Sequence, residues 1–173
     1  MKYGDTKTIT HSVVIREDIP TGLSYDALVA AFERELGHWD QGIESSLIEQ
    51  HAPWDKVESV FQGMAGPHGL MIFFHVDQGR LTSLVDGIKR CSLYIVGNGI
   101  IAEKILTIDV RASLYVPFRV CLYDNGNPRG AIIAYDRPSS LLAALQQPAL
   151  IPIGYLLDSE MDSVVQALRS NYR

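Results

Sequence analysis

The chain has few of the features that mark secreted, metal-binding or disulfide-bonded proteins. Its 173 residues contain two cysteines, Cys91 and Cys121, and no Cys-x-x-Cys pair that would predict a zinc cage or a redox motif. Both cysteines lie in apolar, strand-like runs, so we expect buried free thiols and no disulfide. The opening MKYGDTKTIT lacks the apolar core of a secretory signal, which predicts a cytoplasmic protein.

Positive charge is also scarce. Fifteen Lys and Arg against twenty Asp and Glu give a net charge of −5, and no basic cluster stands out, so we expect no nucleic-acid partner. The segment from Pro138 to Leu157 carries no charged residue, but Pro148 and Pro152 interrupt it. We therefore expect no membrane span there, but a buried helix followed by a turn and a short strand.

What is present is the composition of one folded domain. Apolar residues make up 47% and charged residues 20%, which is typical of a globular chain rather than a disordered one. The length suits a single domain over residues 1–173, and such a domain buries enough surface to fold without disulfides or a metal.

Hydrophobic periodicity predicts a mixture of strands and helices. Ser24 suits an N-cap, and Leu28, Phe32 and Leu36 follow at helical spacing until Gly37. The pattern predicts further helices at 98–108, at 139–147 and from 159 onward, and strands at 11–18, 70–76, 91–96, 117–123 and 131–135. The last two strands form a hairpin, so an α+β fold is favoured over an alternating parallel one. Residues 38–62 stay unassigned, apart from a short helix that Pro53 could open.

Three segments resemble one known family. They are CSLYIVGNGIIA (91–102), LYVPFRVCLY (114–123) and AYDRPS (134–139), and they are similar to the domain-of-unknown-function 302 family. The resemblance covers about residues 63–168, with Gly99 standing where that family has a proline. It implies a single domain similar to the TATA-binding-protein-like group, with helices over a curved, mainly antiparallel sheet. It implies no activity.

The turn Gly97-Asn98-Gly99 is the first candidate site. It ends a predicted strand and opens a predicted helix, where free backbone N–H groups and the positive end of the helix favour an anion. The alternative is an ordinary capped turn whose glycines serve the backbone geometry.

Arginines and tyrosines on apolar strands form the second candidate site. Arg119 and Tyr123 share a strand face, Tyr135 and Arg137 alternate along the next arm, and Tyr94 lies on a third strand. If these faces line one hollow, they could orient a small, anionic organic ligand. Alternatively, the arginines pair with Asp124 or Asp136 and the tyrosines cover an edge of the sheet.

His75 and Asp77 are the catalytic candidates. They alternate along one strand, so both side chains can face the same side, where a carboxylate can orient a histidine that acts as a general base. The sequence locates no third ligand, so we predict no metal site. Asp77 also begins a turn, which explains it without any catalytic role.

Three functions remain open from the sequence. The first is a small-molecule-binding protein that needs no cofactor and has its pocket between sheet and helices. The second is a cofactor-independent lyase or isomerase that uses His75 and Asp77. The third is a structural or interaction domain in which the uncharged segment from Pro138 to Leu157 forms a homodimer face. Whether the protein is an enzyme does not follow from the sequence.

Overall fold

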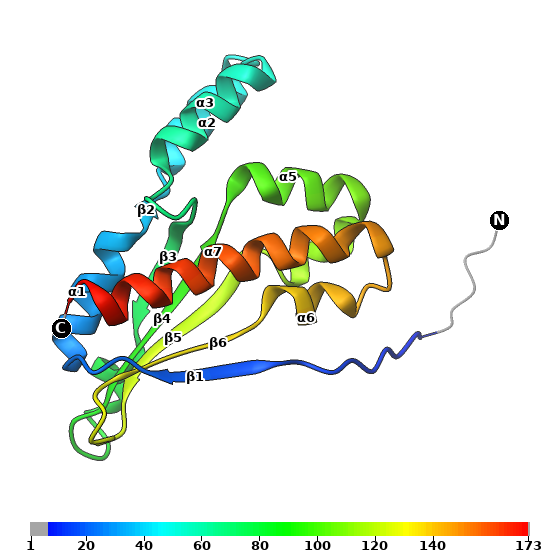
Figure 1. Cartoon of the computed structure of the whole chain (residues 1–173). Helices are drawn as coiled ribbons and strands as arrows, with labels where there is room; N and C mark the ends of the chain where they lie inside the picture. The colour runs from blue at the N-terminus through cyan, green and yellow to red at the C-terminus, as the bar shows by residue number, and fades with distance from the viewer. Residues whose placement is uncertain (1–6, 173) are drawn as a thin grey trace.

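The computed structural model describes residues 7–172, and its centre is a six-stranded sheet in the order β1-β6-β5-β4-β3-β2 (Figure 1). All neighbouring strands are antiparallel except the short parallel pair of β2 and β3. The strands are β1 (Arg16–Pro20), β2 (Gly37–His38), β3 (Met71–Asp77), β4 (Arg90–Gly97), β5 (Phe118–Asp124) and β6 (Ile132–Asp136). The predicted α+β fold with a mainly antiparallel sheet is confirmed.

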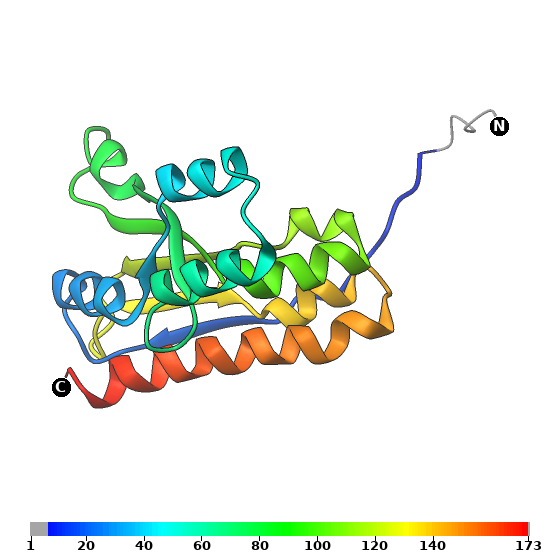
Figure 2. The same cartoon turned by 90° about the horizontal axis from the view of Figure 1, so that it is seen from above.

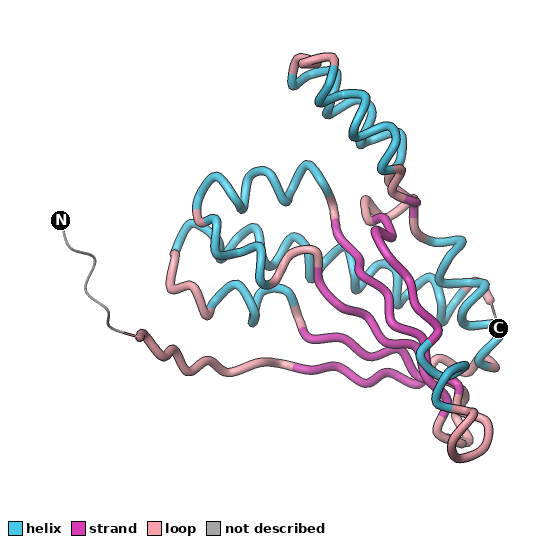
Figure 3. Tube along the Cα trace, turned by 180° about the vertical axis from the view of Figure 1, so that it is seen from behind, coloured by secondary structure: helices cyan, strands magenta, loops and turns pink. Residues whose placement is uncertain are grey.

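Helices cover one face of this sheet and leave the other open. The helices of the described residues are α1 (Tyr25–Glu35), α2 (Gln41–Glu49), α3 (Trp54–Met64), α4 (Gln78–Thr82), α5 (Gly99–Ile108), α6 (Pro138–Ala143) and α7 (Ile151–Ser170), with 3-10 turns at η1 (Val110–Leu114) and η2 (Pro148–Leu150). Of these, α2 and α3 project beyond the sheet (Figure 1). Seen from behind, β3 to β6 lie in front of α1, α5 and α7, with no long helix over them (Figure 3).

The core lies between the sheet and its helices. Tyr94, Val120 and Tyr135 are direct neighbours on β4, β5 and β6, and all three are buried under the helical layer. Because side chains alternate along a strand, the residues beside them, such as Leu93 and Arg119, point to the open face. One continuous cluster of buried side chains joins this layer to α1, α5 and α7, as expected for a single domain.

Several helices begin where the sequence predicts. Ser24 caps α1 by accepting a hydrogen bond from the N–H of Ala27, and Asn98 caps α5 in the same manner. The hairpin of β5 and β6 is also confirmed. No helix within residues 7–172 has both the length and the apolar character that crossing a bilayer requires.

Two boundary predictions are wrong. The first strand begins at Arg16 rather than His11, because its partner β6 ends opposite Arg16, at Asp136. The last helix begins at Ile151 rather than near Ser159, and the described residues 144–150 before it form no strand. Pro152 lies in the first turn of α7, where its missing N–H costs no hydrogen bond, so it opens the helix that it was expected to exclude.

The position of β3 also corrects the sequence reading. Its apolar run predicts a central strand covered on both faces, but β3 lies second from the edge and Phe74 is 58% exposed. A bulge between Ile72 and Phe74 shifts the pairing with β4. The cysteines are free, as predicted, yet only half-buried, because Cys91 and Cys121 belong to the open face, with their sulfur atoms 3.7 Å apart.

Candidate functional site

A cleft lies away from the sheet, between α5 and the helical hairpin formed by α2 and α3. The hairpin projects beyond the sheet beside the start of α5 (Figures 1 and 2). The cleft has a volume of about 590 Å³, within the range of small-molecule sites. Most of its lining is apolar and comes from Leu47, Ile48, Ala52, Trp54, Val57, Phe61, Gly99, Ala102 and Leu106.

Local sequence explains why the hairpin forms. Asp40 caps α2 by accepting hydrogen bonds from the N–H groups of Gly42 and Ile43, and Pro53 stands at the N-cap of α3. Trp39 then holds the base of the hairpin to the sheet. Its ring stacks on Phe61 of α3 at 5.1 Å between centroids and lies 5.0 Å from Phe73 of β3.

Polar side chains border the cleft on both sides. Glu44 comes from α2, His51 from the turn of the hairpin, and Glu103 and Thr107 from α5. The Thr107 hydroxyl lies 3.1 Å from Glu103 Oε1, to which it donates a hydrogen bond. No Lys or Arg is among the described lining residues, so the rim carries two carboxylates and no fixed positive charge.

The predicted anion site at Gly97-Asn98-Gly99 is occupied by the chain itself. Asn98 Oδ1 accepts hydrogen bonds from the N–H groups of Ile100 and Ile101, and its amide donates to the carbonyl of Gly69. These helix amides are therefore not available to a ligand. The turn is the capped turn of the alternative interpretation, and only Gly99 borders the large cleft.

A buried carboxyl group lies beside this turn. Glu160 of α7 approaches both Gly69 and Asn98, and its Oε2 is buried without a hydrogen-bond partner among the described residues. Burial raises the pKa of Glu160 to about 7, and the Asn98 amide opposes that shift only in part. An anionic ligand at this turn would therefore lie beside the acidic side chain of Glu160.

His75 and Asp77 share the helix-facing side of β3, as their alternation predicts, but each has a different partner. His75 stacks on Tyr94 at 4.3 Å between ring centroids and lies 3.3 Å from the Ser92 hydroxyl. Asp77 caps α4 by accepting from the N–H of Arg80. No hydrogen bond joins His75 to Asp77 in the described part of the chain, so the geometry gives Asp77 the turn-forming role that the alternative assigned to it.

Tyr94, Tyr135 and Arg137 belong to the covered side of the sheet. The Tyr94 hydroxyl donates to Glu33 at 2.8 Å, and burial, with that carboxylate beside it, raises the pKa of Tyr94 well above its usual value. The Tyr135 hydroxyl is buried and has no partner among the described atoms. Arg137 does pair with carboxylates, but not with those expected.

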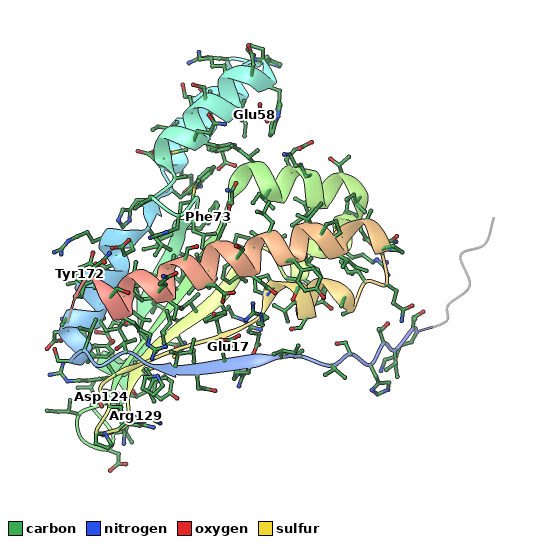
Figure 4. The ribbon with its side chains drawn as sticks, in the orientation of Figure 1. Glu17, Glu58, Phe73, Asp124, Arg129 and Tyr172 are labelled. Atoms are coloured by element: carbon green, nitrogen blue, oxygen red, sulfur yellow. The ribbon has the colours of Figure 1, made fainter. Side chains whose placement is uncertain are left out.

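Three carboxylates surround the Arg137 guanidinium. It donates to Asp158 at 3.1 Å and to Asp162 at 3.0 Å, both on α7, and also to Glu17 of β1. Figure 4 shows Glu17 in this position, between β1 and α7. The alternative interpretation, in which Arg137 pairs with Asp124 or Asp136, is wrong, because Asp136 binds Arg16 at 2.8 Å and Asp124 accepts from the N–H of Gly126.

Arg119 and Tyr123 lie on the opposite, open face. They border a hollow of about 410 Å³ with Arg16, Asp18, Leu93, Cys121, Ala134 and Asp136, and with Tyr135 at its back. The Tyr123 hydroxyl donates to Asp18 at 3.0 Å, while Arg119 has no ion pair among residues 7–172. Binding of an anion by Arg119 stays a prediction.

The expected single hollow is therefore not formed. The sheet separates the side chains of Arg119 and Tyr123 from those of Tyr94 and Arg137, so one ligand cannot contact all four, although Tyr135 also borders the open-face hollow. The cleft beside α5 is not predicted from the sequence, because the pattern assigns no element to most of residues 38–62. A signal was available there, since Asp40 suits an N-cap and Ile43 and Leu47 follow at four-residue spacing. No three His, Cys, Asp or Glu side chains of the described residues are close enough to hold a metal ion.

Comparison with known proteins supports a family and a fold. No curated protein matches the sequence significantly. Among solved structures, the chain is similar to the crystal structure of an uncharacterized conserved DUF302 protein from Bacillus stearothermophilus, with 12% sequence identity and a TM-score of 0.62. That match covers 89% of this chain and 98% of the other, and it concerns the fold alone. Residues 48–168 match the model of the family described as "Domain of unknown function DUF302", and the chain belongs to that family.

Proposed function

We propose that this protein binds an apolar small molecule in the cleft between the α2–α3 hairpin and α5. The observation that carries the proposal is the cleft itself, about 590 Å³ in volume and lined mainly by apolar side chains from three helices. A site of this size and composition suits a drug-sized organic molecule. The site replaces the pocket between sheet and helices that the sequence suggested.

The rim determines which apolar molecules fit. Glu44 and Glu103 face the cleft from opposite sides, and no basic side chain is among its described lining residues. A carboxylate on the ligand would be repelled, whereas an amine could bind one or both glutamates. The favoured ligand is therefore an apolar molecule with a neutral or positively charged head, rather than the anionic ligand expected from the sequence.

A fluorescent probe tests this binding site. N-phenyl-1-naphthylamine, which is neutral and apolar, should become brighter on binding the full chain. Ala102→Trp places an indole in the cleft from α5 and should weaken probe binding at least roughly tenfold. Ala143→Trp makes the same change at an exposed position of α6 and should leave binding unaltered. Equal binding by both variants would refute the cleft as the site.

Competition distinguishes the ligand class. Dodecylamine should displace the probe at a lower concentration than dodecanoate, because only the amine complements the glutamates. Glu103→Gln should reduce this preference. If dodecanoate competes better, the proposed charge preference is wrong even where the cleft itself binds the probe.

A further inference from the structure

The segment that precedes β1 has an unusual distribution of apolar side chains. Residues 7–15, here called the arm, run in extended conformation from β1 past α6 and away from the sheet (Figure 1). Ile9, Val13 and Ile15 are 66%, 84% and 53% exposed, and Val14 is 43% exposed. An extended segment with so many exposed aliphatic side chains is typical of a surface that another chain covers.

The arm also has free main-chain groups. Its attachment to the rest of the described chain is at Ile15, whose carbonyl accepts from the N–H of Arg137 and whose N–H donates to Ser140 Oγ. Within residues 7–172, no hydrogen bond joins the main chain of residues 7–14 to any other segment. The side chains of Thr8, Thr10 and Ser12 border a hollow beside η1 and α6, but the main chain of residues 7–14 pairs with no other strand of the described chain.

Hydrogen bonds of β1 show which groups point outward. Ile15 and Thr21 direct their main-chain groups toward the rest of the sheet, Thr21 by donating to the carbonyl of Ala131. Because these groups alternate in direction along a strand, Val14, Arg16 and Asp18 direct theirs to the free edge. Pro20 lacks an N–H and blocks pairing at the far end of β1, but no proline occurs between residues 7 and 19.

We infer that the arm and β1 pair with the same segment of a second copy of this chain, antiparallel and centred on Val14. In this register Ile15 faces Val13 of the partner subunit, and Ile19 faces Ile9 of the partner subunit. Glu17 faces His11 of the partner subunit, which adds an acidic–imidazole pair. A shift by one residue would instead place Ile15 opposite His11 of the partner subunit and Glu17 opposite Ile9 of the partner subunit. The side chains therefore select the register centred on Val14.

The resulting dimer would extend one sheet through both subunits. It would cover the exposed aliphatic residues of the arm and satisfy the outward main-chain groups of both edges. The Glu17 carboxylate can bind Arg137 and the histidine of the partner subunit together, since Arg137 binds its Oε1 and leaves Oε2 for the imidazole. The interface is separate from the cleft beside α5, so the inferred dimer does not depend on the proposed function.

Oligomeric state is the first test. Light scattering on the full chain should give twice the mass of one chain. Val14→Asp would bring two carboxylates face to face at the twofold axis and should raise the dissociation constant at least roughly tenfold. Val85→Asp makes the same change at a side chain that is 89% exposed in the loop after α4, and should leave the dimer intact. A wild-type protein that stays monomeric at all concentrations would overturn the inference.

Cross-linking tests the register. In a background with Cys91→Ser and Cys121→Ser, Val14→Cys should form an intermolecular disulfide when diamide oxidises the two thiols and takes up their two hydrogens. Directly opposed residues of such a pair have Cα atoms about 5.5 Å apart, which a disulfide can bridge. Thr8→Cys lies far from its own copy in antiparallel arms and should not cross-link. Cross-linking through residue 8 but not residue 14 would overturn the register centred on Val14.

Discussion

At the scale of single residues, the carboxyl group of Glu160 has an unfavourable environment for its charged form. Glu160 extends from α7 toward the turn that opens α5, and its buried Oε2 lacks a hydrogen-bond partner among the described atoms. Its pKa of about 7 lies above its ordinary value of 4.5, so the folded protein binds more protons than the unfolded chain between these values. The contribution of protonated Glu160 to the free energy of unfolding is therefore fully present below about pH 4.5 and is lost as the pH rises through 7.

Glu160→Gln removes this dependence. Because the amide cannot ionise, we expect the variant to unfold at a higher urea concentration than the wild type at pH 8, with a gain of about 1 kcal/mol after allowance for partial exposure. At pH 4.5 to 5 the two proteins should have nearly equal midpoints. A difference that does not change between these pH values would show that Glu160 does not titrate there.

At the scale of elements, the hairpin of α2 and α3 depends on a close approach of two backbone segments. A Cβ atom on Gly37 would lie 1.8 Å from the carbonyl oxygen of Met64, and one on Gly66 would lie 2.5 Å from the N of Gly37. Only glycine permits this approach, because both obstructing atoms belong to the backbone. The hairpin, and with it the cleft, is positioned by these two residues.

Gly37→Ala should therefore move the hairpin from its position. We expect a loss of about 2 kcal/mol in unfolding free energy, together with faster hydrogen exchange in α2 and α3. Gly63→Ala is the matched control, because no atom lies within 4 Å of its Cβ position and it lies inside α3. That change should stabilise the protein by about 0.5–1 kcal/mol. Equal effects of the two substitutions would contradict the close approach.

At the scale of the whole molecule, one arginine connects three elements distant in sequence. Arg137, at the end of β6, binds Glu17 of β1 and two aspartates of α7, of which Asp158 has only 3% of its side chain exposed. Ser139 also donates to Asp158, through both its N–H and its hydroxyl. The C-terminal helix is thus joined electrostatically to the edge of the sheet.

Arg137→Ala should destabilise the fold by about 3 kcal/mol, because it leaves the buried carboxylate of Asp158 without its counter-charge. Arg90→Ala removes an arginine that pairs with Asp26 at 2.7 Å in an exposed position, and should cost less than about 1 kcal/mol. Urea unfolding of both variants at pH 7 provides the measurement. A small effect at Arg137 would mean that solvent already screens Asp158.

Features that depend on near neighbours in the chain are specified locally, by their own residues. The caps at Ser24 and Asn98, the alternation along β5 and the hairpin with β6 are local, so their residues specify them. Family membership followed from short segments in the same way. The predicted start of α7 is wrong because a proline interrupts a helix in its interior but is tolerated in its first turn, where Pro152 lies.

Which side of the sheet each residue faces, and which residue lies opposite it, depends on how distant segments pack together. Alternation along a strand predicts that Arg119 and Tyr123 share a face, and that Tyr135 and Arg137 share a face. Whether these two pairs lie on the same face of the sheet depends on the register between β5 and β6, which places them on opposite faces. The partners of Arg137 are equally distant in sequence. The cleft depends on how α2, α3 and α5 pack together. The edge position of β1 depends on the order of the strands in the sheet. Neither property is encoded in a single segment of the chain.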